Sequence, residues 1–157
     1  MKLHISVGKS FTKPGYLNID PITGQGNELS VKADIRKLDE FVSDSECTEI
    51  IAENVLDYLE AGEADQALQH WVKKLRHGGK IIIGGTDAHQ ISKMFYYKEI
   101  DIEKFNLLTH GQFSAPWDVF MSHTTIEDLL QKLESYGIKI LKKRIDGFNL
   151  VIEGERP

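Results

Sequence analysis

The chain has 157 residues, of which 41% are hydrophobic and 27% are charged, and its formal net charge is −5. This length suits one domain, so we interpret residues 1–157 as a single unit. The one cysteine, Cys47, excludes an internal disulfide and a site built from several thiolates. No apolar run approaches the roughly 18–20 residues of a membrane span, and the N-terminus lacks a signal-peptide pattern. We therefore expect a cytoplasmic globular protein with no membrane partner.

Charge is unevenly distributed along the chain. Residues 38–72 hold ten acidic side chains and no Lys or Arg. A surface that binds nucleic acid needs a basic stripe interleaved with aromatic platforms. The acidic middle of the chain therefore argues against nucleic acid as a partner.

Four strands are predicted in the first third of the chain. Apolar residues that alternate with polar ones, or that are β-branched, indicate strands over residues 3–7, 16–20, 29–34 and 48–52. Lys13-Pro14-Gly15 predicts a turn before the second strand, and Gly24–Asn27 a loop before the third. The link of about residues 8–15 is too short for a crossover helix between parallel strands.

A helix and a central strand follow. Residues 63–77 carry apolar side chains at helical spacing on one face: Ala64, Ala67, Leu68, Trp71, Val72 and Leu75. Gly78-Gly79 predicts the end of this helix, with basic residues near the negative end of its dipole. Lys80–Gly84 then predicts the central strand of the sheet.

The last part of the chain predicts helices and a hairpin. Residues 94–108 indicate one or two short helices, and Thr124–Glu127 fits a capping box for a helix that Gly137 ends. Residues 138–144 and 148–153 predict two strands joined by a turn at Asp146-Gly147. Strands that alternate with helices indicate an α/β fold with a mostly parallel twisted sheet, flanking helices and one C-terminal antiparallel hairpin.

Ligands of open α/β sheets bind beyond the carboxyl ends of the strands. Small or acidic residues lie at the end of each predicted strand or just after it: Ser6-Val7-Gly8, Asp20, Asp34-Ile35, Glu53-Asn54 and Gly84–Asp87. A carboxylate accepts two vicinal hydroxyls at once, so the ordered set suits a ligand with hydroxyls, an amine and an adenine edge. Each residue alone also has an ordinary explanation as part of a turn.

Four segments match, in order, the motifs of one enzyme family. LHISVGKSFTKPGYLNID (3–20) is similar to the family's LNLGCG and PGYxNVD, and ADIRKLDEF (33–41) to its "AD-hydrophobic" segment. IIAENVLDYL (50–59) and ALQHWVKKLRHGGKIIIGGTD (67–87) match two later motifs. The chain therefore resembles the small class I S-adenosylmethionine-dependent methyltransferases (methyltransferase type 11-like) over nearly its whole length. That resemblance implies a Rossmann-like methyltransferase fold.

The resemblance also implies a cofactor, S-adenosylmethionine, and roles for the residues that match. It places Ser6, Val7 and Gly8 against the methionine part, Asp20 at the ribose hydroxyls, Asp34 and Ile35 at the adenine, and Glu53 and Asn54 near the sulfonium. The implied reaction is methyl transfer to a small molecule or a glycan hydroxyl, for which the protein aligns the acceptor and excludes water. The candidates for a base that deprotonates a hydroxyl are His110, His123 and Asp87.

Two departures from the family pattern keep an alternative function open. Ser6 replaces the first glycine of the cofactor loop and adds a side chain where backbone approaches the ligand closely. Asp57-Tyr58 stands where the family has Glu-His. The alternative is a catalytically silent methyltransferase-like binding or regulatory domain.

The remaining polar and aromatic residues raise two further questions. His89, His110, His123 and Asp87 lack the i, i+4 spacing of a zinc motif, so we expect no metal. The segment GQFSAPWDVF (111–120) is too aromatic for a solvated loop and either caps the core as a lid or lines an acceptor pocket.

So short a chain covers the acceptor side of the site thinly. We therefore expect a homo-oligomer or a partner subunit to complete it.

Overall fold

The computed structural model describes residues 1–9, 12–24 and 29–157. Its strands form one seven-stranded sheet in the order β3-β2-β1-β4-β5-β7-β6. The first five pair in parallel: β1 (Lys2–Ile5), β2 (Leu17–Ile19), β3 (Ser30–Val31), β4 (Cys47–Glu53) and β5 (Leu75–Thr86). The hairpin of β6 (Lys139–Asp146) and β7 (Asn149–Glu155) joins antiparallel to β5. The predicted α/β fold with a C-terminal antiparallel hairpin is confirmed.

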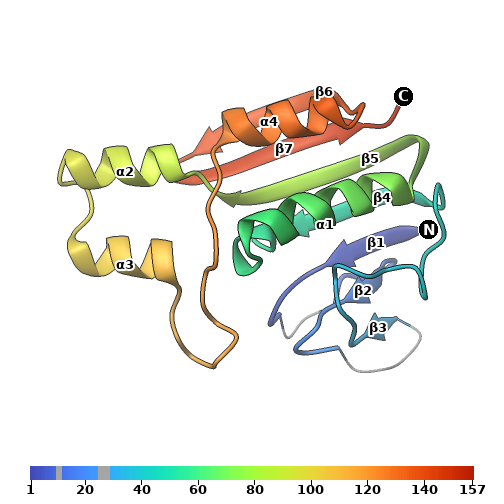
Figure 1. The fold of residues 1–157 in the computed structure, drawn as a ribbon, viewed down its shortest axis with the longest axis horizontal. Coiled ribbons are helices and arrows are strands. Elements are labelled where there is room, and N and C mark those ends of the chain that lie inside the picture. Colours follow the sequence, from blue (N-terminus) through green and yellow to red (C-terminus); the bar gives the residue numbers. More distant parts are fainter. Residues whose placement is uncertain (10–11, 25–28) are drawn as a thin grey trace.

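The helices lie on one face of the sheet or beyond its edge (Figure 1). They are the 3-10 helix η1 (Leu56–Tyr58) and the α-helices α1 (Ala61–Lys74), α2 (Ala88–Tyr96), α3 (Ile102–His110) and α4 (Ile126–Ser135). α1 and α4 cover the same face, whereas α2 and α3 extend past the C-terminal end of β5. None of the helices in the described part of the chain has the length and apolar character needed to cross a membrane.

The core forms between the sheet and the two helices that cover it. Leu3, Ile50 and Ile81 lie in register on neighbouring strands and are fully buried. Trp71 of α1 is also fully buried, and its indole Nε1 donates to the Ile35 carbonyl oxygen at 2.8 Å. This hydrogen bond fixes the segment after β3 against α1, at the edge of the sheet where the parallel strands end.

The opposite face of the sheet carries charge. Lys2, Glu49 and Lys80 lie in register on β1, β4 and β5, one position out of phase with the core residues. Successive side chains of a strand point to opposite faces, so these three point away from the helices. Helices usually cover both faces of a parallel sheet, and the alternation of charged and apolar residues explains how this one tolerates water on one side.

The first long helix differs from its predicted bounds. It begins at Ala61, where the Glu60 carboxylate accepts from two backbone amides, and it ends at Lys74 rather than at Gly78-Gly79. Residues 75–77 belong to β5 instead, because Leu75 pairs with Cys47 of β4. Pairing with a neighbouring strand thus outweighs the helical pattern of these residues.

Other local predictions hold with shifted boundaries. The cap of α4 is Thr125, whose hydroxyl accepts from the Asp128 amide at 3.2 Å, rather than Thr124. Gly137, with φ +86°, ends that helix as predicted. The aromatic region forms two helices, and the first begins earlier, at Ala88. Residues 10 and 11 of the opening motif and 25–28, which include most of the predicted Gly24–Asn27 loop, lie outside the described residues.

Candidate active site

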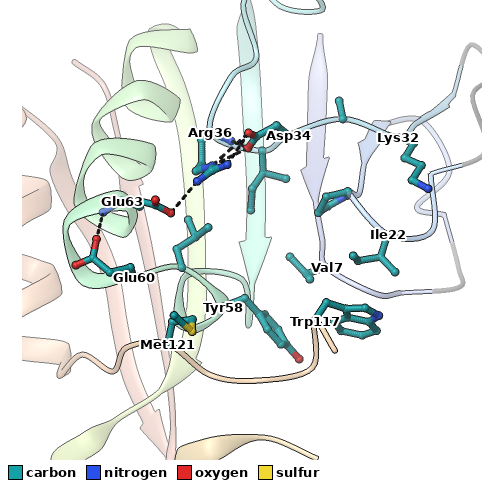
Figure 2. A pocket seen from close by; sticks show the side chains of 14 residues that line it. Val7, Ile22, Lys32, Asp34, Arg36, Tyr58, Glu60, Glu63, Trp117 and Met121 are labelled. Carbon is teal, nitrogen blue, oxygen red and sulfur yellow. Dashed lines mark hydrogen bonds and ion pairs between the residues drawn. The ribbon is translucent and has the colours of Figure 1, made fainter. Parts of the chain in front are cut away.

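A cavity of about 640 Å³ lies beyond the C-terminal ends of the first four strands (Figure 2). The chain builds the sheet outward from β1 to β3 and then returns to place β4 on the other side of β1. Such a reversal of strand order is where α/β sheets bind ligands. Residues that follow all four strands line the cavity: Val7, Pro21, Ile22, Lys32, Ala33, Asp34, Ile35, Arg36, Tyr58, Leu59, Glu60 and Glu63, with Trp117 and Met121 from the later segment.

Asp20 connects the loops after β1 and β2. Its carboxylate is only 4% exposed and accepts six hydrogen bonds of 2.8–3.2 Å. The donors are the backbone amides of Gly8, Lys9, Ile22 and Thr23 and the hydroxyls of Ser6 and Thr23. Burial raises the pKa of Asp20, but the hydrogen bonds outweigh it and leave the pKa below its usual value. Asp20 does not line the cavity.

The Ser6 side chain points toward Asp20. Its hydroxyl donates to Asp20 Oδ2 at 3.2 Å, the residue is 4% exposed, and it does not line the cavity. The side chain that replaces the family's first glycine therefore takes no space from the cavity. It adds one more donor to the carboxylate that holds the loop.

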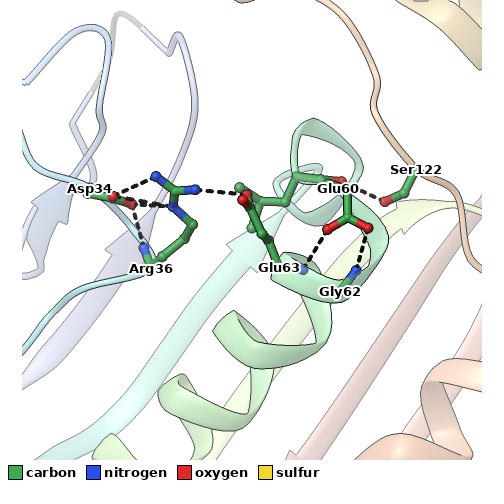
Figure 3. A network of polar contacts seen from close by, with 7 residues as sticks. Asp34, Arg36, Glu60, Gly62, Glu63 and Ser122 are labelled. Carbon is green, nitrogen blue, oxygen red and sulfur yellow. Dashed lines mark hydrogen bonds and ion pairs between the residues drawn. The ribbon is translucent and has the colours of Figure 1, made fainter.

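A charged network borders one end of the cavity (Figure 3). Arg36 forms an ion pair with Asp34 through Nε and Nη2 and donates from Nη1 to Glu63 of α1 at 2.8 Å. The hydrogen bonds from Arg36 lower the pKa of Asp34, against a smaller opposing effect of burial. Asp34 and Ile35 line the cavity as predicted residues, but both oxygens of Asp34 already accept from Arg36.

Aromatic side chains form the other end of the cavity. The Tyr58 and Trp117 rings lie side by side, with centroids 5.9 Å apart and planes tilted by 55°. Trp117 lies directly on Gly8 of the loop after β1, where an added Cβ atom would come within 2.1 Å of the indole Cη2. Of the two interpretations of segment 111–120, the structure supports both in part, since Trp117 packs against the core and also lines the cavity.

Replacing Gly8 with alanine is expected to displace Trp117. Gly8 has φ +71°, which costs an L-residue roughly 1–2 kcal/mol, and the added methyl group would overlap the indole. We expect the tryptophan emission to shift to longer wavelength as the indole enters water, because the only other tryptophan, Trp71, is fully buried.

Gly15→Ala is the matched control for Gly8→Ala. Gly15 has φ +80°, but a Cβ atom added there would meet no heavy atom within 4 Å, so it tests backbone strain without steric overlap. An emission spectrum that shifts equally in both variants would contradict the contact between Gly8 and Trp117.

The three candidate bases do not meet in this cavity. His110, at the end of α3, lines a separate cavity, and His123 is exposed with its Nε2 2.5 Å from the Thr109 carbonyl oxygen. Asp87 is 1% exposed and accepts from the Ile126 amide at 3.4 Å, which links α2 to the start of α4. Glu53, the last residue of β4, and Asn54, which follows it, are exposed and do not line the cavity either.

Sequence reasoning missed two groups in this region. Arg36 lies inside the matched segment 33–41 but received no role there, and Glu63 meets it only because α1 starts next to the loop after β3. Asp57, 6% exposed, stands out in the sequence only as a departure from the family pattern. Its burial raises its pKa to about 6, while nearby His123 lowers it. The only signal for Asp57 in the sequence was its place, with Tyr58, in the segment that follows the predicted strand 48–52.

Comparison with known proteins identifies the fold. No family model and no curated protein matches the sequence. The structure is similar to a SAM-dependent methyltransferase from Methanosarcina mazei, with TM-score 0.65 and 12% identity over 99% of this chain and 92% of that one. It is also similar to 1,6-didemethyltoxoflavin-N1-methyltransferase from Burkholderia thailandensis, solved with bound 1,6-didemethyltoxoflavin and S-adenosylhomocysteine. That match has TM-score 0.61 and 10% identity over 98% and 70% of the two chains.

A third similar structure is the partner of the Trm112 methyltransferase activator in a complex from Haloferax volcanii. The TM-score is 0.62, with 12% identity over 89% of this chain and 71% of that one. Against two longer O-methyltransferase structures, this chain spans only 35% and 33% of their length. The fold is that of the class I S-adenosylmethionine-dependent methyltransferases, and two of the similar structures were solved with the cofactor or its demethylated product.

Proposed function

We propose that the chain is an S-adenosylmethionine-dependent methyltransferase acting on a small molecule or a glycan hydroxyl. One observation carries the proposal: the loops after β1, β2 and β3 converge on a single cavity at the reversal of strand order. The similar methyltransferase that was solved with 1,6-didemethyltoxoflavin supports a small-molecule acceptor. The cavity volume also lies within the range of small-molecule and cofactor sites.

The residues around the cavity fit the cofactor in part. Val7 and Gly8 would contact its methionine part, and Ile35 and Asp34 its adenine. The bound cofactor supplies a methyl group that its sulfonium makes electrophilic, so the chain's own task is to orient the acceptor and exclude water. Direct contacts from Asp20 to the ribose and from Glu53 and Asn54 to the sulfonium stay predictions.

Asp20 has a second role in this proposal. Because its carboxylate fixes the amides of both loops, it sets the shape of the cavity wall even without touching a ligand. Ser6 assists it through the hydroxyl. These contacts support a cofactor loop that is organised before any ligand binds.

The base assignments stay predictions too. His110→Ala and His123→Ala should spare cofactor binding and lower turnover if either residue accepts the acceptor's proton. Unchanged turnover in both variants would leave alignment of the two reactants as the main contribution of the chain.

The alternative of a catalytically silent domain is favoured by one observation. None of the described residues that line the cavity is a histidine, and the carboxylates that line it, Asp34, Glu60 and Glu63, already accept hydrogen bonds within the chain. Binding of S-adenosylmethionine without transfer to any acceptor in a mixed small-molecule extract would favour this alternative. Release of S-adenosylhomocysteine in that assay would exclude it.

Calorimetric titration tests whether the chain binds the proposed cofactor in this cavity. We expect S-adenosylhomocysteine to bind the parent chain and to bind Ala33→Phe at least tenfold more weakly, because Ala33 lines the cavity and a phenyl group would fill part of it. Ala61→Phe, at the exposed start of α1, is the matched control. No binding to the parent chain at millimolar ligand would contradict the proposal, provided that thermal melting shows a folded protein.

Assembly and location stay predictions as well. Large aromatic side chains on the α2–α3 hairpin are exposed, among them Phe95, Tyr96 and Tyr97. This exposure supports a homo-oligomer or a partner subunit next to the acceptor side. Sedimentation velocity on the purified chain distinguishes a monomer from a self-associated form.

A further inference from the structure

The two ends of the cavity differ in chemistry (Figure 2). Asp34, Arg36 and Glu63 make one end charged and mutually paired. Trp117, Tyr58 and Met121 make the other end aromatic and apolar. If the charged end takes the adenine of the cofactor, as proposed above for Asp34, the aromatic end is left for the group that receives the methyl.

The aromatic end is held in place before any ligand binds. Residues 113–118 close on themselves, since the Phe113 amide donates to the Asp118 carbonyl oxygen at 3.1 Å and the Ser114 hydroxyl donates to Asp118 Oδ2 at 2.5 Å. This turn presents Trp117 to Gly8, and Tyr58 packs between Trp117 and Phe120 at centroid distances of 5.9 and 5.1 Å. The rings therefore form a preorganised wall, which reduces the entropic cost of binding.

The polar side chains described at this end already have partners within the chain. Glu60 accepts from the Gly62 and Glu63 amides, and the Ser122 hydroxyl donates to the Leu59 carbonyl oxygen at 2.7 Å (Figure 3). The Tyr58 hydroxyl donates to Asp118 at 3.5 Å. A sugar carries hydroxyls on every side, and each of them needs a new hydrogen-bond partner when it loses water. The face of a flat aromatic ring needs only contact with other aromatic or apolar side chains.

We propose that the methyl acceptor is a planar aromatic small molecule that carries a hydroxyl or amine, and that it stacks on the wall formed by Trp117, Tyr58 and Met121. This inference rests on the proposed methyltransferase function and selects the small molecule over the glycan. The acceptor's oxygen or nitrogen forms a bond to the methyl carbon as the S–CH3 bond breaks and leaves its electron pair on sulfur. The acceptor's proton passes to water, and the sulfonium becomes a neutral thioether.

Trp117 is assigned as a specificity residue in this scheme, because it has the largest ring in the wall. Trp117→Phe keeps an aromatic face, whereas Trp117→Leu keeps only apolar volume. Comparing the two variants separates stacking from simple hydrophobic contact. Phe95→Leu is the matched control, since Phe95 is an aromatic residue of the α2–α3 hairpin outside this cavity.

The test is calorimetric titration of the full chain, saturated with S-adenosylhomocysteine, with 2-naphthol, its saturated analogue 2-decalol, and methyl glucoside. We expect 2-naphthol to bind at least tenfold more tightly than the other two. Trp117→Leu should weaken its binding about tenfold, and Trp117→Phe and Phe95→Leu should weaken it less than threefold.

Three results would overturn the inference: equal binding of 2-naphthol and 2-decalol, tighter binding of methyl glucoside, or unchanged binding of 2-naphthol by Trp117→Leu. Absence of 2-naphthol binding at millimolar concentration would overturn it too. The first titration, with S-adenosylhomocysteine alone, keeps the two proposals apart. If that ligand binds and 2-naphthol fails, only the acceptor class is wrong; if it does not bind, the methyltransferase proposal fails and the acceptor assignment with it.

Discussion

Asp20→Ala is expected to lower the free energy of unfolding by roughly 3 kcal/mol or more and to remove measurable binding of S-adenosylhomocysteine. The carboxylate is buried and serves four backbone amides and two hydroxyls. Each buried donor left without a partner costs about 1–3 kcal/mol, although water entering the vacated space recovers part of that cost. Urea denaturation and calorimetric titration measure the two effects.

Asp20→Asn separates charge from shape. The amide keeps the size of the side chain but replaces one acceptor oxygen with a donor. We therefore expect Asp20→Asn to lower the free energy of unfolding, but by less than Asp20→Ala does. Asp146→Ala, at the exposed last residue of β6, is the control and should change stability by less than about 0.5 kcal/mol. An Asp20→Ala variant as stable as this control would show that the loops do not depend on the carboxylate.

The pH dependence of Asp20 follows from its lowered pKa. Burial alone would raise the pKa, but the hydrogen bonds favour the charged form, and their combined effect is the larger one. The stability that Asp20 contributes is therefore present above its unfolded pKa of about 3.9 and is lost as the pH falls through the lower folded value. The stability gap between the parent chain and Asp20→Asn should accordingly narrow on acidification.

Asp57→Asn is expected to raise the free energy of unfolding at pH 8 by about 3 kcal/mol. Burial raises the pKa of Asp57 from 3.8 to about 6, against a smaller lowering by His123. A shift of this size corresponds to about 1.4 kcal/mol per pH unit. Asparagine has no charge to bury and keeps an oxygen that can accept from the Thr86 amide, which donates to Asp57.

The sign of the pH effect tests the same assignment. A raised folded pKa means that the contribution of Asp57 is fully present below about pH 4 and is lost as the pH rises through 6. The difference between parent and variant should therefore vanish near pH 4 and reach its full value by pH 8 in denaturation curves. A difference that is constant over this range would mean that Asp57 does not titrate differently in the folded and unfolded chain.

His123 provides a second check on Asp57. The positive charge of His123 lowers the pKa of Asp57, so His123→Gln should move the titration of the Asp57 carboxyl to higher pH. Carboxyl-carbon NMR of the two proteins measures that shift. A titration at unchanged pH would place His123 too far from Asp57 to influence it.

The strand positions could be predicted because their patterns are local. The alternation of apolar and polar residues over 3–7, and the run Ile81–Ile83, indicate strands without any knowledge of their neighbours. The hairpin signal Asp146-Gly147 and the helix end at Gly137 are local as well. Residues 75–77 show where local patterns fail as predictors. They continue a helical pattern, yet they belong to β5, in which Leu75 pairs with Cys47 of β4.

Some features of the candidate site could likewise be predicted from the sequence, and others could not. The positions of Val7, Asp34 and Ile35 on the cavity wall follow from their places after predicted strands. The sequence could not show that Arg36 donates hydrogen bonds to both oxygens of Asp34, or that Asp20 accepts six hydrogen bonds. The donors come from loops whose paths depend on the rest of the fold. Nor could it show that His110 and His123 lie away from the cavity.

The sequence by itself thus determined the class of sheet, its antiparallel C-terminal edge and the set of loops that follow the parallel strands, because strand periodicity and turn residues act over a few positions. The tertiary structure alone decided which carboxylates are already bonded, where Trp117 lies on Gly8, and that burial shifts the pKa of Asp57. Hydrogen bonding and desolvation depend on groups distant in the chain, and only the folded packing brings those groups together.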